Sequence, residues 1–370
     1  MVSTSPGEPL TAYGWTAARA RRYAALVAEA GLDAARCRPA RTVRVIRSFA
    51  RLATAGGEVD ARIPGRLRVD GGDRPAVGDW VVLEAAPGTE GVVQAILPRA
   101  SKLSRKVAGA RTEEQVLAAN VDTVFLVMGL DGDFNLRRLE RLAVAAHQSG
   151  AEPVVVLTKS DLLAAEALAE RRAEVADAAP GVAVFAVSSP EHAGLEPLRL
   201  YLETGRTVVL LGSSGVGKST LLNALVGRQV MKTAAVREGD DRGKHTTTHR
   251  ELVLLPGGGL LIDGPGLREM QLWLDEEPDD ALADAFVDVE ELAGRCRFRD
   301  CTHDAEPGCA VQEAIERGDL EASRLANYHA LHQELKALVR RKDVAADRQF
   351  FRKQGKLYKK IQAEKEDRRE

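Results

Sequence analysis

The stretch Thr207-Val-Val-Leu-Leu-Gly-Ser-Ser-Gly-Val-Gly-Lys-Ser-Thr220 decides the fold of the central part of the chain. It places the pattern G-x-x-x-x-G-K-[ST] after an apolar strand and before a helix predicted over residues 218–226. Glycines let backbone N–H groups wrap phosphates, and the helix N-terminus adds partial positive charge. We expect Lys218 on the β- and γ-phosphates and Ser219 on Mg²⁺. The predicted phosphate loop comprises Gly212, Ser213, Ser214, Gly215, Val216, Gly217, Lys218, Ser219 and Thr220.

A second motif selects the base. Thr158, Lys159, Ser160 and Asp161 end an apolar strand and match [NT]-K-x-D. The Asp161 carboxylate can accept from the ring N1–H and the exocyclic amine of guanine, a pattern that adenine does not offer. Thr158 stands where Asn is usual; its hydroxyl can still donate one hydrogen bond, so we expect weaker base affinity without loss of specificity.

Ser188 and Ser189, at the end of the strand over 182–187, fit the loop that closes over the base.

Two further segments resemble the switches of a GTPase. Asp263-Gly-Pro-Gly266 follows an apolar strand and matches D-x-x-G. We expect Asp263 to hold Mg²⁺ through water and the Gly266 N–H to sense the γ-phosphate. Between this motif and the phosphate loop, Thr247 is the first choice for a further Mg²⁺ ligand and Thr246 the alternative.

The catalytic group that orients water is not obvious. Ras-type enzymes place a Gln just after D-x-x-G, whereas this chain has Leu267. We expect slow intrinsic hydrolysis that a partner or another residue completes. His245, beside the switch threonines, is the candidate for orienting water; Lys218 and Thr247 are the other predicted catalytic residues.

The order of these motifs identifies the architecture. Ordinary G domains run phosphate loop, switch threonine, D-x-x-G, guanine motif and base loop, whereas here the guanine motif comes first and the cyclic order is kept. Strands and amphipathic helices alternate from about residue 120 onward, which predicts a mostly parallel sheet covered on both faces. The sequence therefore predicts a circularly permuted P-loop GTPase domain.

The chain before residue 105 has a different pattern. Short β-rich pieces over 42–49, 60–69, 79–84 and 91–97 are separated by Gly, Pro and Asp turns. This spacing predicts a small antiparallel barrel, preferably an OB-fold, although an SH3-like barrel gives nearly the same pattern. The residues before the barrel predict one helix over 17–30.

A compact cluster of metal-ligand residues lies near the C-terminus. Cys296, Cys301, His303 and Cys309 fit a closed tetrahedral Zn²⁺ site with a structural role. Cys37 lies far away and is interpreted as an isolated thiol.

Composition limits the partners. The 370 residues carry a formal net charge of only -2, but residues 36–51 contain six arginines and no acid, and residues 340–370 contain twelve basic and six acidic residues. Such excesses suit a phosphate-rich partner or a solvated face. With no stretch long enough to span a bilayer and no secretory signal, we expect a cytoplasmic protein with no membrane partner.

The combination of motifs resembles the RsgA (YjeQ/YloQ) family of small-ribosomal-subunit-dependent GTPases. The matching residues are TKSD (158–161), GSSGVGKST (212–220), GKHTTT (243–248), DGPG (263–266) and CRFRDCTHDAEPGC (296–309). The resemblance implies a factor that acts in late maturation of the small subunit. It implies that the protein hydrolyses GTP to GDP and phosphate and that the subunit stimulates this hydrolysis. It also implies that the barrel and zinc domain contact ribosomal RNA and that His245 is the family's proposed catalytic histidine.

The expected organisation has five segments: an extension over 1–39, an OB-fold barrel over 40–104, the permuted GTPase domain over 105–272, a zinc-binding domain over 273–335 and a basic tail helix over 336–370. We expect a monomer. Arg36–Arg51, Arg99, Lys102, Arg105 and Lys106 are candidate phosphate contacts beside the barrel, and Arg340–Lys365 a tail helix that orders on RNA. A non-ribosomal GTPase switch and a non-catalytic RNA-binding module are the alternatives.

Overall fold

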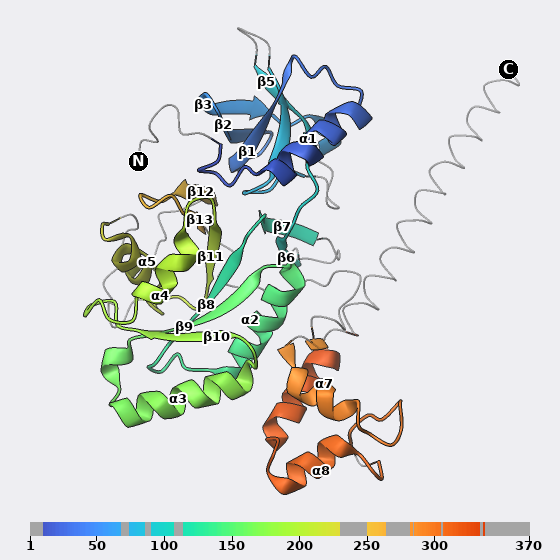
Figure 1. Cartoon of the computed structure of the whole chain (residues 1–370), viewed down its shortest axis with the longest axis vertical. Helices are drawn as coiled ribbons and strands as arrows, with labels where there is room; N and C mark the ends of the chain where they lie inside the picture. The colour runs from blue at the N-terminus through green and yellow to red at the C-terminus, as the bar shows by residue number, and fades with distance from the viewer. Residues whose placement is uncertain are drawn as a thin grey trace, which may run out of the picture.

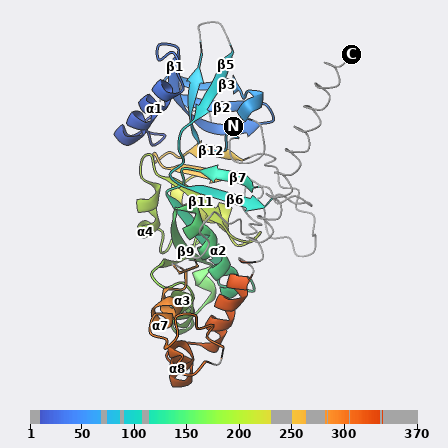
Figure 2. The ribbon, with the colours of Figure 1, turned by 90° about the vertical axis from the view of Figure 1, so that its right-hand side faces the viewer.

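The computed structural model describes residues 10–67, 74–85, 90–106, 114–229, 250–263, 282–283, 285–304, 306–333 and 336. Three parts follow one another along the long axis of the molecule. A barrel lies at one end, a six-stranded sheet with its helices in the middle, and a small helical domain at the other end (Figures 1 and 2). The predicted fold class is confirmed.

The barrel closes in the strand order β1-β2-β3-β5-β4. Its strands are β1 (Cys37–Ile46), β2 (Phe49–Thr54), β3 (Gly57–Arg62), β4 (Trp80–Glu84) and β5 (Gly91–Ile96), with the short 3₁₀ turn η1 (Gly65–Leu67) after β3. Neighbouring strands are antiparallel except β3 and β5, which pair in parallel. Small and branched apolar side chains fill the interior, among them Ala40, Ala61, Val81 and Val93.

Two expectations for the barrel were wrong in detail. The single strand predicted over 42–49 is a hairpin, because the chain turns at Arg47, whose φ is 50°. The strand predicted over 60–69 ends at Arg62. The barrel also takes in part of the predicted extension, since β1 begins at Cys37.

The N-terminal segment packs on the barrel. Helix α1 (Ala17–Glu29) begins after Thr16, whose hydroxyl accepts a hydrogen bond from the Arg19 amide. The Trp15 ring packs against Trp80 of the barrel at an interplanar angle of 53°, with ring centroids 4.7 Å apart. Figure 2 shows α1 on the outside of the barrel.

An unpredicted hairpin joins the barrel to the sheet. It consists of β6 (Lys102–Lys106) and β7 (Glu114–Ala119), which pair antiparallel. Lys102 forms an ion pair with Glu114 at 3.1 Å across this hairpin. Because β6 is rich in charged residues, it does not have the apolar pattern by which strands are recognised.

The central sheet has the strand order β10-β9-β8-β11-β13-β12. Its strands are β8 (Thr123–Gly129), β9 (Glu152–Thr158), β10 (Ala183–Val187), β11 (Thr207–Leu211), β12 (Glu251–Leu254) and β13 (Leu260–Asp263). All neighbours are parallel except the edge strand β12, which is antiparallel to β13 and also lies against barrel strand β1.

Helices cover both faces of this sheet. On one face α2 (Leu136–Ser149) and α3 (Ala165–Ala178) cover Val124 and Leu126 of β8; on the other, α4 (Glu196–Arg199) and α5 (Lys218–Val226) cover Phe125 and Val127. Short 3₁₀ segments η2 (Ser160–Leu162) and η3 (Leu200–Leu202) complete the connections. Helix α3 begins only at Ala165, because residues 160–162 form the separate turn η2.

The C-terminal domain contains α7 (Val287–Ala293), α8 (Ala310–Arg317) and a helix over 322–333. Its core includes Phe286 and Val311 and reaches Val144 and Ala145 of α2. Among the helices in the described part of the chain, none is long and apolar enough to cross a bilayer.

Candidate nucleotide site and metal centre

The predicted nucleotide motifs meet at one edge of the central sheet. Strands β10, β9, β8, β11 and β13 run in parallel, so their carboxyl ends lie together. Ser188, Thr158, Gly212 and Asp263 each stand at or just after one of these ends. The chain runs outward from β8 to β10 on one side and from β11 to β13 on the other. A sheet of this kind binds ligands at such a reversal of strand order, here between β8 and β11.

The phosphate loop has the backbone that its glycines predict. Gly212, Gly215 and Gly217 have φ values of 154°, 81° and 97°. A Cβ on Gly212 would lie 2.3 Å from the Val127 carbonyl oxygen of β8, so only glycine fits there. The Lys218 ammonium donates to the Gly212 carbonyl at 2.7 Å and also to that of Ser213, which holds the cation over the loop.

The remaining residues of the phosphate loop differ in exposure. Ser214 and Gly215 are exposed at the tip, and Val216 is buried beneath it. Ser219 and Thr220 lie in the first turn of α5, whose N-terminus points at the loop. Free N–H groups of a first helical turn attract anions.

Thr158 contacts the phosphate loop rather than the base side of the site. Its side chain is buried, and its hydroxyl donates to the Val216 carbonyl oxygen at 2.6 Å. We had expected this hydrogen bond to be available to the base. The structure instead uses it to tie the guanine motif to the loop, and Asp161 is exposed in η2.

Lys159 has a partner that sequence reasoning missed. Its backbone is left-handed, with φ of 62°, and its ammonium forms an ion pair with Asp131, just after β8. Burial alone would raise the pKa of Asp131, but hydrogen bonds from Lys159 and from the Asp133 amide outweigh it and lower that pKa. The position of an acid directly after a buried strand was the signal that could have identified Asp131.

The base-loop residues are ordered by local contacts. Ser188 and Ser189 are buried, and the Ser188 hydroxyl accepts from the Glu191 amide at 3.3 Å. Asp263 is half-buried at the end of β13. The predicted residues His245, Thr246, Thr247, Gly266 and Leu267 lie outside the described residues.

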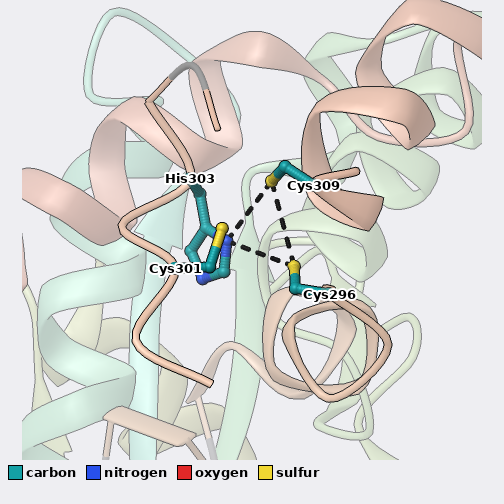
Figure 3. Close-up of side chains that lie close together, drawn as sticks. All are labelled: Cys296, Cys301, His303 and Cys309. Carbon is teal, nitrogen blue, oxygen red and sulfur yellow. Dashed lines mark hydrogen bonds between the residues drawn. The ribbon is translucent and has the colours of Figure 1, made fainter. Parts of the chain in front are cut away.

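The four predicted metal ligands come together in the C-terminal domain (Figure 3). One ligand atom from each of Cys296, Cys301, His303 and Cys309 lies within 4.8 Å of all the others. The Cys296 and Cys309 sulfurs are 3.9 Å apart, and His303 Nδ1 is 3.6 Å and 3.5 Å from them. A tetrahedral Zn²⁺ with bonds of about 2.0 to 2.3 Å requires ligand separations of roughly 3.5 to 3.8 Å. Cys296, Cys309 and His303 Nδ1 therefore lie at separations that fit a metal ion, and Cys301 lies within 4.8 Å of them.

Hydrogen bonds fix this cluster. Gln312 donates to the His303 carbonyl oxygen, and the Cys309 sulfur accepts from the Gln312 amide at 3.5 Å, which caps α8. Burial and the neighbouring His329 lower the pKa of His303, so its imidazole is neutral, the form that binds metal.

Comparison with known proteins identifies the family. The RsgA GTPase family model matches residues 96–273. The chain is 45% identical over 332 residues to the "Small ribosomal subunit biogenesis GTPase RsgA" of Opitutus terrae, covering 86% of this chain and 89% of that protein. The chain belongs to the RsgA GTPase family. It is a GTP-hydrolysing enzyme.

Other relatives agree. A protein of the same name from Xanthomonas campestris is 50% identical over 272 residues, or 73% of this chain and 72% of that one. The crystal structure of YjeQ from Thermotoga maritima, 26% identical, covers 81% of this chain and 98% of its own with a TM-score of 0.61. That of YloQ, described as a circularly permuted GTPase, is 25% identical, covers 81% of this chain and 96% of its own, and has a TM-score of 0.60.

Several cations of this RsgA-family chain are engaged within the protein. Arg41 was expected to contact phosphate, but it is fully buried between the barrel and the sheet. Arg99 pairs with the buried Asp79 at 2.7 Å, and Lys102 with Glu114. From the sequence alone, a cation with an acidic partner inside the protein cannot be distinguished from a cation on a free surface.

Proposed function

We propose that this protein binds the small ribosomal subunit and acts in its late maturation, with hydrolysis of GTP stimulated by the subunit. The observation that carries the proposal is the meeting of four motif segments, those of Thr158, Ser188, Gly212 and Asp263, at the carboxyl ends of the parallel strands. The chain also aligns over most of its length with relatives named for small-subunit biogenesis. The placement of separate domains on both sides of the GTPase sheet suits a large, extended partner (Figure 1).

At the nucleotide site we assign GTP binding to the guanine motif, the base loop, the phosphate loop, Asp263 and Gly266. Lys218 and the first turn of α5 compensate the phosphate charge, which increases on the leaving group as the γ-phosphoryl is transferred to water. Asp161 reads the guanine edge. His245 orients the attacking water and Thr247 completes the switch.

Two metal ions belong to this proposal. Mg²⁺ would be held by Ser219, Thr247 and, through water, Asp263, and when bound it neutralises charge on the phosphates. Zn²⁺ would be held by the Cys–Cys–His–Cys cluster and stabilise the C-terminal domain.

The barrel presents an aromatic side chain beside arginines. Phe49 is 43% exposed and lies opposite Arg62 in the β2–β3 pair and opposite Ile46 in the β1–β2 pair. Directly opposed residues of antiparallel strands project from the same face. Arg47 in the adjoining turn is exposed. An exposed ring flanked by guanidinium groups suits an unpaired base and its phosphate.

The C-terminal domain repeats this arrangement inside the metal loop. Phe298 is 43% exposed, and the Arg297 guanidinium lies 5.5 Å from its ring centre. Arg295 and Arg299 beside it are exposed as well. Cys301 donates its amide to the Phe298 carbonyl at 3.4 Å, so the ring is attached to the metal-binding segment.

Ribosome binding by single-residue variants tests the RNA surface. Base stacking on an aromatic side chain contributes about 1–3 kcal/mol, so Phe49→Ala and Phe298→Ala should each weaken binding to purified small subunits by roughly 5- to 100-fold. Leu200→Ala is the control, because Leu200 is 65% exposed but lies on η3 of the sheet domain. Unchanged binding by both phenylalanine variants would remove these surfaces from the proposal.

His245→Ala tests the catalytic assignment separately. It should lower stimulated turnover by at least about tenfold, since positioning of a reacting group contributes on this scale, while GTP affinity stays within twofold. Stimulated turnover equal to that of the wild type would exclude His245 as the water-orienting residue.

A further inference from the structure

We propose that Arg41 and Thr207 couple the barrel to the strand that carries the phosphate loop, so that forces on the barrel reach the nucleotide site. Arg41 is thus a positioning residue for hydrolysis rather than an RNA contact. The inference rests on the proposed function in one respect: it assumes that the barrel is a domain on which a partner acts.

The contacts of Arg41 join four segments that are distant in sequence. Its Nε donates to the Gly78 carbonyl at 3.2 Å, and one Nη donates to the Asn120 carbonyl at 3.1 Å and to the Thr207 hydroxyl at 2.9 Å. Its other Nη donates to the Tyr13 carbonyl. One guanidinium group therefore joins the barrel, the linker after β7, the first residue of β11 and the N-terminal segment by hydrogen bonds; we call this group of contacts the Arg41 node.

Moving this buried cation away from its acceptors would require a large free energy. Arg41 is 0% exposed, and its side chain lies against the Trp80 ring at 5.4 Å. Burial, and to a smaller extent Arg19, lower its pKa to about 9, although Asp122 and Asp79 partly offset this shift. The group is still charged at neutral pH. A buried charge whose donors lose their acceptors is strongly destabilised, so the segments around it move as one unit.

Thr207 connects this node to the nucleotide site over the length of one strand. It is the first residue of β11, whose last residue, Leu211, precedes the phosphate loop. The first residues of this strand are held on both sides: the Thr207 amide donates to the Asp122 carboxylate at 2.7 Å, and the Arg206 carbonyl accepts from the Leu260 amide of β13 at 2.8 Å. Displacement at Thr207 thus moves both the phosphate loop and the strand that ends in Asp263.

The N-terminal segment covers the Arg41 contacts and shields them from solvent. Gly14 and Gly205 have φ values of 84° and 81° and approach so closely that a Cβ on Gly14 would lie 2.6 Å from the Gly205 carbonyl oxygen. Leu10 and Tyr13 are buried in the same seam. Water is therefore kept from the Arg41 hydrogen bonds, which strengthens them.

Three variants isolate the Thr207 hydroxyl. Thr207→Val removes the hydroxyl and keeps the shape, whereas Thr207→Ser keeps the hydroxyl. Thr123→Val is the matched control, because Thr123 is also fully buried at the start of the adjacent strand β8 but its hydroxyl finds no hydrogen-bond partner among the residues that the structure describes. The readout is hydrogen exchange of β1 amides in the full chain with GDP and with a non-hydrolysable GTP analogue.

In the wild type, Thr207→Ser and Thr123→Val, we expect β1 exchange rates to differ at least threefold between the two nucleotides. In Thr207→Val this difference should disappear. With purified small subunits, Thr207→Val should also lose about tenfold in stimulated turnover while unstimulated turnover and subunit affinity stay within twofold. A β1 difference that persists in Thr207→Val, is absent from the wild type, or is lost equally in Thr123→Val overturns the coupling.

Hydrogen exchange requires no ribosome, so this result is independent of the proposed partner. If subunits fail to stimulate even the wild type, the proposed function fails and the exchange data still decide the coupling.

Discussion

The two junctions of the central sheet domain each contain a buried arginine, but these arginines have different partners. At the barrel junction, Arg41 donates to main-chain carbonyls and to the Thr207 hydroxyl. At the other junction, Arg324 forms a two-pronged pair with Asp288 and reaches Glu140 of α2 at 3.1 Å. Hydrogen bonds from Arg41 to neutral acceptors orient the segments that they join, whereas the carboxylates that Arg324 contacts also compensate its positive charge.

The two junctions also differ in how much apolar core they share with the central sheet. The barrel residues Val43 and Trp80 belong to the same continuous core as Val124 of the sheet. The C-terminal core includes only Val144 and Ala145 from the described part of the sheet domain. The barrel is therefore built to move with the sheet, while the C-terminal domain is held chiefly through Arg324, which also lies 4.0 Å from the Phe286 ring centre.

The largest predicted effect concerns the metal. Small zinc-binding peptides gain about 10–16 kcal/mol from Zn²⁺, which is folding free energy. Treatment with a chelator should therefore abolish exchange protection of α7 and α8 and leave that of β8 and β11 unchanged. Cys309→Ser should have the same effect and Cys37→Ser none. Full protection of α8 without metal would contradict a structural metal site.

The next effect compares the two arginines. Arg324→Met removes the guanidinium that pairs with the buried carboxylate of Glu140, which should cost about 3–5 kcal/mol in the opening free energy of the C-terminal domain. Arg41→Met leaves neutral acceptors and removes a buried charge, so about 1–3 kcal/mol is expected. Arg317→Met, which breaks an exposed pair with Asp319, is the control. Hydrogen exchange measures all three; a larger loss in Arg41→Met would reverse the comparison.

Two glycine variants test the N-terminal seam. Gly14 and Gly31 both have positive φ, but a Cβ on Gly31 meets no heavy atom within 4 Å. Gly31→Ala should cost about 1–2 kcal/mol from backbone conformation alone. Gly14→Ala should cost a further 1–3 kcal/mol, roughly, because the seam must open. Equal losses on chemical denaturation would mean that the seam adapts freely.

The smallest effect is a pH dependence at Glu140. Burial raises the pKa of Glu140, and Arg324 offsets this only in part. The folded pKa thus lies above the ordinary value of 4.5, so the stabilising contribution of the protonated carboxyl is complete below pH 4.5 and is lost as pH rises through the raised pKa. Over that pH range the wild type should become less stable relative to Glu140→Gln; a wild type that gained stability relative to Glu140→Gln as pH rises would contradict this sign.

Sequence patterns predicted the elements that depend on local signals. Strand Thr207–Leu211 and helix Lys218–Val226 have the predicted bounds, because an apolar run and a glycine-rich loop define both. The β1–β2 turn was missed because Arg47 takes a left-handed conformation without glycine or proline nearby.

Side-chain partners were harder to predict. Arg41 was interpreted as a phosphate contact because its acceptors lie up to 166 residues away in sequence. The Thr158 hydroxyl was assigned to the base for the same reason, since the approach of Val216 depends on the folded sheet. Local spacing does show the four metal ligands, which fall within fourteen residues.

The most direct test of the account is GTP turnover by the full chain with and without purified small ribosomal subunits. We predict slow turnover alone and at least about tenfold faster turnover with subunits. Turnover that subunits leave unchanged would indicate a GTPase switch with another partner, and no turnover under either condition a non-catalytic RNA-binding protein. Either result would contradict the proposed function.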